Sequence, residues 1–233
     1  MKENIITFEA RGSHVFEVRE KPVPAVKLIP QWWKDIPKYS NEENKLDLDP
    51  RSTVTVKQCA PTMDALSLGY IITLWADLLV TQVEGVPWIR WTAGQDVLSA
   101  WDLSQSSKFE VPYGYSNPAF KYYHGWNILT KPGWSTLFIH PLGYQNLPFN
   151  SIPGVVDTDI LTTDINCPFF VREGFEGLIP KGTPMVQLIP FKRESWVSDY
   201  TVSSDEKLYI ESEKHRTKLY GYYSSKRAKK SFK

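Results

Sequence analysis

Apolar and polar residues alternate along several short segments of the chain, a pattern that predicts β-strands. Residues 53–59 alternate in this way, and residues 5–19 do so in places. The segments LLVTQVEG (78–85) and VPWIRWTA (86–93) predict a hairpin that turns at Glu84–Gly85. The sequence therefore predicts a mainly β fold of the β-sandwich, β-clip or jelly-roll type.

Two segments have the three- and four-residue spacing of apolar residues that is typical of an amphipathic helix. The first covers about residues 62–78, where Thr62 is placed to cap the first turn. The second covers about residues 204–222, and Ser203 with Glu206 three residues later matches a capping box. Because the chain has no internal repeat and no clear linker, we expect residues 1–233 to form a single domain.

A proline-rich stretch, residues 20–52, separates the first predicted strands from the rest of the chain. Its prolines exclude regular structure over most of its length. Trp32 and Trp33 lie in its middle, and rings of this size seldom remain fully in water. We therefore expect an extended arm that uses Trp32 and Trp33 to lie across a surface, either of its own domain or of a neighbouring subunit.

The end of the chain, residues 224–233, forms a basic tail. Its last eight residues carry five positive charges and no acid, although the net charge of the whole chain is only +1. Such a cluster predicts an anionic partner, either nucleic acid or an acidic protein; the alternative is a solubilising terminus. The residues expected to contact that partner are Lys226, Arg227, Lys229 and Lys230.

The composition excludes a disordered chain and sets the expected location. Nine Trp, twelve Tyr and eleven Phe, with 42% hydrophobic residues overall, supply a sizeable core and favour β structure. Cys59 and Cys167 lack the spacing of a zinc site or a disulfide framework, which indicates a reducing compartment. The longest apolar segment, residues 66–80, is too short to span a bilayer. We expect no membrane association, no cofactor, and a location in the cytoplasm of a host cell or in a virion.

An acidic turn, GVVDTD (154–159), lies between apolar β-forming residues. Asp157 and Asp159 share one side of an extended strand, because side chains alternate with a period of two. Paired carboxylates bind a cation or divide general acid and base roles, but in turns they also accept backbone N–H groups, and both interpretations stay open. Arg193 is placed to form a forked ion pair with either aspartate. Gln187, in an apolar strand, predicts either an anchor of the sheet or a residue that reads a ligand.

The run PGVVDTD, followed by a strand and then by IPKGTPMVQLI, resembles the third motif of the trimeric dUTPase and dCTP deaminase superfamily, which has a β-clip fold. The residues that fit this motif are Gly154, Val155, Val156, Asp157, Gly182 and Gln187. The resemblance implies that Asp157 orients an attacking water as general base in pyrophosphate cleavage. The chain departs from the motif at Ile160, where the family has an aromatic residue, and at Thr162, where it has glycine.

A second resemblance covers about residues 22–196 and rests on the WWK arm, CAPTMDALSLGYI, LFIHPLGYQNLPF and IPKGTPMVQLIPFKRESW. In this combination the chain is similar to a group of uncharacterised proteins from tailed phages and bacteria. This resemblance implies a phage origin and brings no activity with it. We therefore expect a non-enzymatic interaction or assembly protein, a phage virion component whose partners are other copies or other virion proteins.

Two enzymatic or metal-dependent alternatives remain at this stage. The first is a β-clip hydrolase that acts on a nucleotide or another small phosphorylated substrate through Asp157, with Asp159 and Gln187 beside it. The second is a cupin-like metalloprotein in which His140 binds a metal with Asp157 or Asp159. The ordinary interpretation of His140 is a hydrogen-bonded histidine at a strand end, because the other histidines do not complete the spacing of a metal site.

Overall fold

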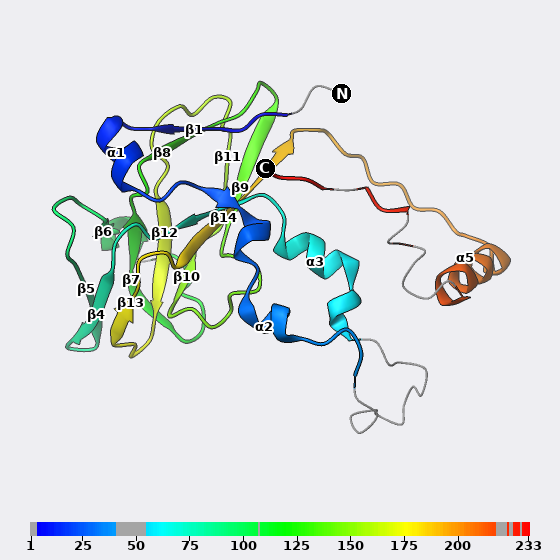
Figure 1. The fold of residues 1–233 in the computed structure, drawn as a ribbon, viewed down its shortest axis with the longest axis horizontal. Coiled ribbons are helices and arrows are strands. Elements are labelled where there is room, and N and C mark those ends of the chain that lie inside the picture. Colours follow the sequence, from blue (N-terminus) through cyan, green and yellow to red (C-terminus); the bar gives the residue numbers. More distant parts are fainter. Residues whose placement is uncertain (1–3, 41–54, 107, 218–222, 224–225, 229) are drawn as a thin grey trace.

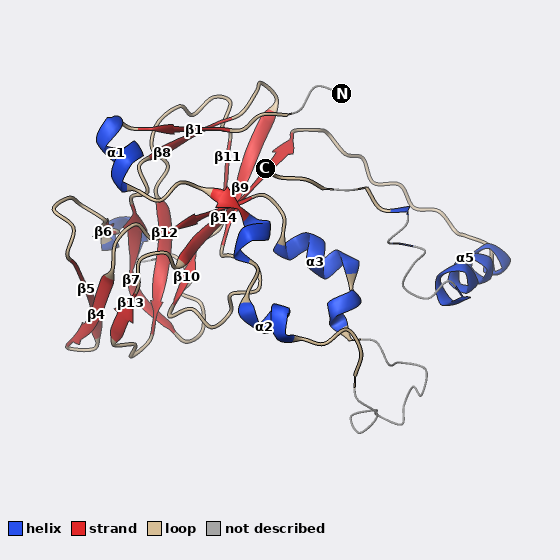
Figure 2. Ribbon diagram, viewed as in Figure 1, coloured by secondary structure: helices blue, strands red, loops and turns tan. Residues whose placement is uncertain are grey.

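The computed structural model describes residues 4–40, 55–106, 108–217, 223, 226–228 and 230–233. Within these residues there are 14 strands in four antiparallel sheets and five short helices, which confirms the mainly β fold (Figure 1). Figure 2 shows that the strands gather in one body, while the last helix lies apart from it. No described helix is long and apolar enough to cross a membrane.

The two larger sheets form the centre of the body. The five-stranded sheet has the order β11-β9-β14-β3-β2, with the bounds β2 (Val23–Pro24), β3 (Tyr70–Thr73), β9 (Trp134–Ile139), β11 (Gly154–Val156) and β14 (Pro184–Lys192). The four-stranded sheet has the order β10-β12-β7-β6, with the bounds β6 (Leu98–Ala100), β7 (Tyr115–Tyr122), β10 (Phe149–Ser151) and β12 (Cys167–Arg172).

The two smaller sheets flank this centre. The three-stranded sheet has the order β13-β4-β5, with the bounds β4 (Leu78–Val83), β5 (Val86–Trp91) and β13 (Gly177–Ile179). The fourth sheet pairs β1 (Thr7–Ala10) with β8 (Trp126–Leu129). The four helices near the body are α1 (Ser13–Val18), α2 (Gln31–Asp35), α3 (Ala60–Leu66) and α4 (Leu103–Ser106).

One hydrophobic core receives side chains from all four sheets, among them Ile72, Val80, Phe169 and Ile128. Tyr122 is fully buried where these layers meet. Its hydroxyl donates to the carbonyl of Thr73 at 2.8 Å and accepts from the backbone N–H of Trp75 at 3.1 Å, so β7 is joined to the end of β3. Burial raises the pKa of Tyr122, which remains a neutral hydrogen-bonding group.

The internal helix exists, but it ends at Leu66, and the prediction of a helix as far as residue 78 is wrong. Gly69 breaks it: its φ is +72°, and a Cβ there would meet the carbonyl oxygen of Leu188 at 1.9 Å. The chain then enters β3, where the β-branched Ile71 and Ile72 are both buried. The apolar residues whose spacing indicated one long helix therefore belong to two elements, a short helix and a strand that is buried on both faces.

Two of the predicted strands are also corrected. Residues 13–18, in the first predicted strand region, form α1 instead. Residues 56–58 form a 3-10 turn; of the predicted strand at 53–59, the first two residues lie outside the described part of the chain. The hairpin at Glu84–Gly85 is confirmed, with Val83 opposite Val86 and positive φ at both turn residues.

The C-terminal helix α5 (Asp205–Thr217) is confirmed, while the predicted residues 218–222 lie outside the described part. Its cap is Ser204, whose hydroxyl accepts from the backbone N–H of Lys207 at 3.3 Å, so the expected cap Ser203 is one residue too early. An extended segment leads from the end of β14 to this helix. Figure 1 places α5 at one end of the long axis of the molecule and the β4–β5 hairpin at the other.

Candidate functional site

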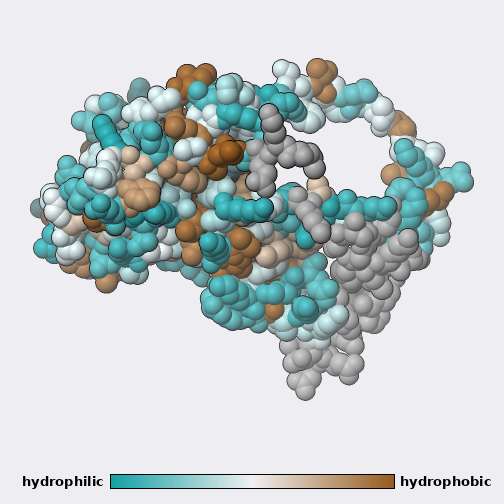
Figure 3. Space-filling model, turned by 45° about the horizontal axis from the view of Figure 1, so that its top comes forward, coloured by the Kyte–Doolittle hydropathy of each residue, from teal (hydrophilic) through white to brown (hydrophobic). Residues whose placement is uncertain are grey.

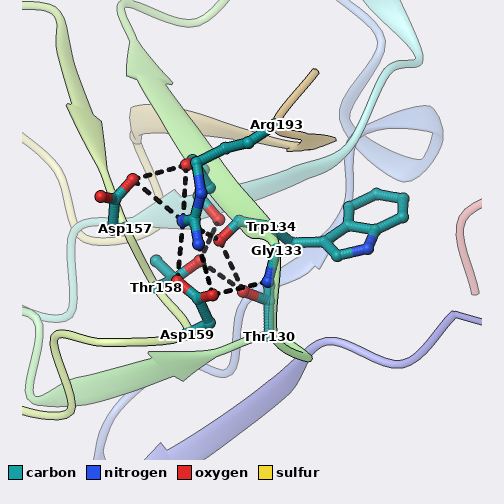
Figure 4. Close-up of polar contacts among 9 residues, drawn as sticks. Thr130, Gly133, Trp134, Asp157, Thr158, Asp159 and Arg193 are labelled. Carbon is teal, nitrogen blue, oxygen red and sulfur yellow. Dashed lines mark hydrogen bonds and ion pairs between the residues drawn. The ribbon is translucent and has the colours of Figure 1, made fainter. Parts of the chain in front are cut away.

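The acidic turn meets Arg193, the residue that follows β14, as Figure 4 shows. The guanidinium of Arg193 binds both carboxylate oxygens of Asp159, at 2.8 Å from Nη1 and 2.6 Å from Nη2. The backbone N–H of Gly133 donates to the same carboxylate at 2.7 Å. This confirms the forked ion pair that the sequence predicted. Arg193 and the Gly133 N–H together hold the pKa of Asp159 down to about 2, below its ordinary 3.8.

Asp157 occupies the outer side of the same cluster. Its Oδ1 accepts from the hydroxyl of Ser135 at 2.6 Å and lies 3.1 Å from Nη1 of Arg193. The side chain of Asp157 is 49% exposed, whereas that of Asp159 is 6% exposed. Both aspartates are therefore ion-paired acceptors within their own chain.

Thr158 holds the acidic turn in place through buried hydrogen bonds. It is fully buried, and its hydroxyl bonds to the hydroxyls of Thr130 at 2.7 Å and Thr136 at 3.0 Å. The backbone N–H of Arg193 donates to the carbonyl of Gly133 at 2.8 Å. The acidic turn therefore links the loop after β8, the strand β9 and the end of β14, and it fixes the place where the chain leaves the body.

Gln187 lies elsewhere in the sheet. It is fully buried, and its amide donates to the carbonyls of Leu68 at 2.6 Å and Ala65 at 3.3 Å, while its oxygen accepts from the N–H of Leu142 at 2.9 Å. Val156, before Asp157, is opposite Thr136, which is in turn opposite Pro190 on β14. Gln187 is three residues from Pro190 along β14, which puts it about 10 Å from that position of the strand. The structure thus brings Asp157 and Asp159 together but keeps Gln187 apart as an anchor of the sheet.

His140 is a hydrogen-bonded residue at the end of β9. Its Nε2 lies 3.0 Å from the carbonyl oxygen of Tyr144, and its Nδ1 accepts from the N–H of Ser151 at 3.2 Å. Burial lowers the pKa of His140. In the described residues no group of three His, Cys, Asp or Glu side chains is placed to hold a metal ion.

Two hollows in the body are lined by residues other than the predicted catalytic ones. One, of about 650 Å³, is lined by residues that include Tyr70, Trp134 and Phe232. The other, of about 610 Å³, is lined by residues that include Arg11 and Arg19. Neither is lined by Asp157, Asp159 or Gln187, so these three side chains do not share a concave site there.

The proline-rich arm packs on its own chain over its described residues, 20–40, and two short helical turns interrupt it. Trp33 is buried with Ile29 and Leu66 in a small cluster of its own. Trp32 is partly exposed, and its indole N–H donates to the carbonyl of Gly143 at 2.7 Å. Of the two tryptophans, Trp32 alone offers surface to a partner; residues 41–52 of the arm lie outside the described part.

The basic tail is also engaged by its own chain. Arg227 and Lys230 both bind the carboxylate of Asp64 on α3, at 2.9 Å and 2.7 Å. Phe232 packs edge-on against Tyr70, with ring centroids 5.8 Å apart. Lys226 is exposed, and Lys229 lies outside the described residues. Part of the charge predicted to meet an anionic partner is therefore neutralised by Asp64.

Two apolar surfaces that the sequence analysis did not identify are exposed. The first is the C-terminal segment (residues 194–204), in which Trp196 is 86%, Tyr200 90% and Val202 101% exposed. Figure 3 shows an open gap between the projecting part of the chain and the body, with hydrophobic side chains at intervals along it. Val197, in the same segment, is 95% exposed. Side chains of a strand alternate between two sides, so the even-numbered Trp196, Tyr200 and Val202 would share one side of a strand formed here, a signal that was present in the sequence.

The second surface is the outer face of the sheet β13-β4-β5, which we call the hairpin face. Strand pairing places Leu178 opposite Leu79, and Val83 opposite Val86. Trp88 is on the same face, opposite Thr81. The five exposed apolar members of the hairpin face are Leu79, Val83, Val86, Trp88 and Leu178.

The comparisons with known proteins are negative. No family model, no curated protein and no solved structure matches this chain. The two sequence resemblances therefore stay predictions.

Proposed function

We propose that this protein is a non-enzymatic assembly protein, which binds further copies of itself through its C-terminal segment (residues 194–204). The observation that carries this proposal is the exposure of Trp196, Tyr200 and Val202 on a stretch of chain outside the body. Large apolar side chains that are exposed together mark a surface for another protein. Burying one such side chain contributes about 1.5–3 kcal/mol, so three of them supply a substantial part of a stable association.

The base of the segment supports this role. Arg193, directly before it, is held by Asp159, by Asp157 and by the carbonyl of Trp134 at 2.9 Å. A fixed base limits the orientations of the segment, and a segment already held in an extended form loses less entropy when it docks. In this proposal the acidic turn contributes to assembly because it binds Arg193 and so fixes the start of the segment.

The setting that we propose is a tailed-phage virion or its assembly, as the second sequence resemblance implies. The partners are then other copies of the chain, with other virion proteins as further neighbours. The location that follows is the cytoplasm of the host cell during assembly and the virion afterwards.

The native mass of the full chain tests the proposal. We expect a species larger than the 26.8 kDa monomer by light scattering after size exclusion, and a monomer for the double variant Trp196→Ser, Tyr200→Ser. Tyr113→Ser is the matched control, because Tyr113 is fully exposed on the body rather than on the segment. A wild-type chain that stays monomeric at high concentration, or a segment variant that still assembles, contradicts the proposal.

A further inference from the structure

We infer that the C-terminal segment of one copy docks on the hairpin face of a second copy, so that the chain assembles head to tail. This inference rests on the proposed function, because it names the surface that receives the segment. The segment is the donor (Trp196, Tyr200, Val202), and the hairpin face is the acceptor.

The positions of donor and acceptor exclude their meeting within one chain. Figure 1 shows the β4–β5 hairpin at one end of the long axis, and α5, to which the segment leads, at the other. The segment begins at the end of β14 in the body and leads away toward α5, so within one chain it does not reach the hairpin face. A contact between two different surfaces is heterologous, and it builds a closed ring or an open filament according to the rotation between neighbours.

The two surfaces match in length. From Trp196 to Val202 the extended chain spans about 20 Å, since each residue of a strand rises about 3.3 Å. The strands β4 and β5 have six residues each and therefore also span about 20 Å. The donor side chains recur every two or four residues, a spacing that matches the two-residue period of side chains along β4 and β5.

The exposed apolar side chains supply a substantial part of the area that an interface buries. A stable interface buries about 800 Å² on each partner. Trp196 and Tyr200 offer roughly 300–500 Å² together, because a large aromatic residue buries about 150–250 Å². Val202 adds to this, and Trp88 supplies an aromatic side chain on the acceptor, 60% exposed in the single chain. Aromatic residues at the centre of an interface contribute most of its binding energy.

A mixing experiment tests the docking. The donor variant is Trp196→Ser, Tyr200→Ser, which keeps the hairpin face; the acceptor variant is Val83→Asp, Trp88→Asp, which keeps the segment. Each variant alone is expected to be a monomer. An equimolar mixture is expected to form a dimer of about twice 26.8 kDa and nothing larger, because each copy then has one working surface.

The outcomes separate this inference from the proposed function. If the acceptor variant assembles as the wild type does, the hairpin face is not the docking surface, and the proposed function stands. If both variants are monomers and their mixture stays monomeric, the head-to-tail contact is also wrong. A wild-type monomer overturns the proposed function and this inference together.

A second measurement tests the docking even if the acceptor variant does not fold. A photo-crosslinking residue placed at Tyr200 in the otherwise wild-type chain is expected to join residues 78–91 or 177–179 of a second copy. The cross-linked peptides are identified by mass spectrometry after mixing isotopically labelled and unlabelled chains. Cross-links confined to other residues overturn the inference without any change to the hairpin face.

Discussion

Arg193 binds both carboxylate oxygens of Asp159, at 2.8 Å and 2.6 Å, at the point where the chain leaves the last strand of its largest sheet. The pair joins the acidic turn to the end of β14. Its place at the base of the C-terminal segment means that the fold and the proposed assembly surface depend on the same two side chains.

We expect Asp159→Asn to weaken this joint and to change the response of the protein to acid. The pKa of Asp159 is lowered to about 2 by Arg193, so the ionised carboxylate stabilises the folded state above about pH 4. That contribution is lost as the pH falls from about 4 to 2. Urea unfolding at pH 7 and across pH 2–5 is therefore expected to show a less stable variant with a smaller loss of stability in acid.

Glu173→Gln, an exposed carboxylate on the turn after β12, is the control for this experiment. It is expected to unfold as the wild type does across the same range. An Asp159→Asn variant with unchanged stability at pH 7 contradicts the role of the ion pair.

The parts of the structure that local chemistry determines were predictable from the sequence. Glu84–Gly85 between two alternating segments predicted a hairpin, because the tight turn needs positive φ at both positions. The Arg193–Asp159 fork followed from residue types that bind each other in one geometry. Both predictions depend on a few neighbouring atoms or on a single well-defined pair.

The parts that depend on distant residues were not predictable. The helix ends early because Gly69 touches the backbone of Leu188, a contact between segments far apart in the sequence. Gln187 is an anchor of the sheet and not a ligand reader, because its amide group bonds to the backbone of Leu142 and Leu68. No pattern near Gln187 in the sequence indicates these partners. The alternation of Trp196, Tyr200 and Val202 was visible, but only the fold shows that the body does not cover it.

We expect Gln187→Leu to destabilise the fold strongly. The substitution leaves the N–H of Leu142 and the carbonyl of Leu68 without the partner that Gln187 now provides. A buried polar group without a hydrogen bond costs about 1–3 kcal/mol, so the loss of unfolding free energy is about 2–6 kcal/mol for the two together. Denaturant unfolding measures it, with Gln31→Leu on the exposed side of α2 as control. A loss of less than about 1 kcal/mol contradicts the anchoring role.

The tail is expected to come free when Asp64 is neutralised. Asp64 binds both Arg227 and Lys230, so Asp64→Asn removes the charge that holds them. Limited trypsin digestion is expected to release the tail faster from this variant than from Asp35→Asn, an exposed aspartate on α2 that serves as control. The freed tail is also expected to bind single-stranded polyanions more tightly at low salt, because its positive charges are no longer neutralised. Equal cleavage rates for the two variants contradict the contact.

His124 is expected to make the stability of the protein fall between about pH 6.5 and pH 4. It is buried, its Nδ1 accepts from the N–H of Trp126, and burial lowers its pKa from 6.5 to about 4. In this range the unfolded chain takes up a proton that the folded chain does not, so stability is present above pH 6.5 and is lost toward pH 4, by on the order of 3 kcal/mol.

The variant His124→Asn tests this assignment, because the oxygen of its amide can accept from Trp126 in place of Nδ1. It is expected to be less stable than the wild type at pH 7, since the smaller side chain leaves a cavity, and to lose most of the slope between pH 6.5 and 4. A residual slope is expected from His140, whose pKa is also lowered by burial. His14→Asn, on the exposed side of α1, is expected to keep the full slope. A full slope in His124→Asn instead places the titrating group elsewhere in the chain.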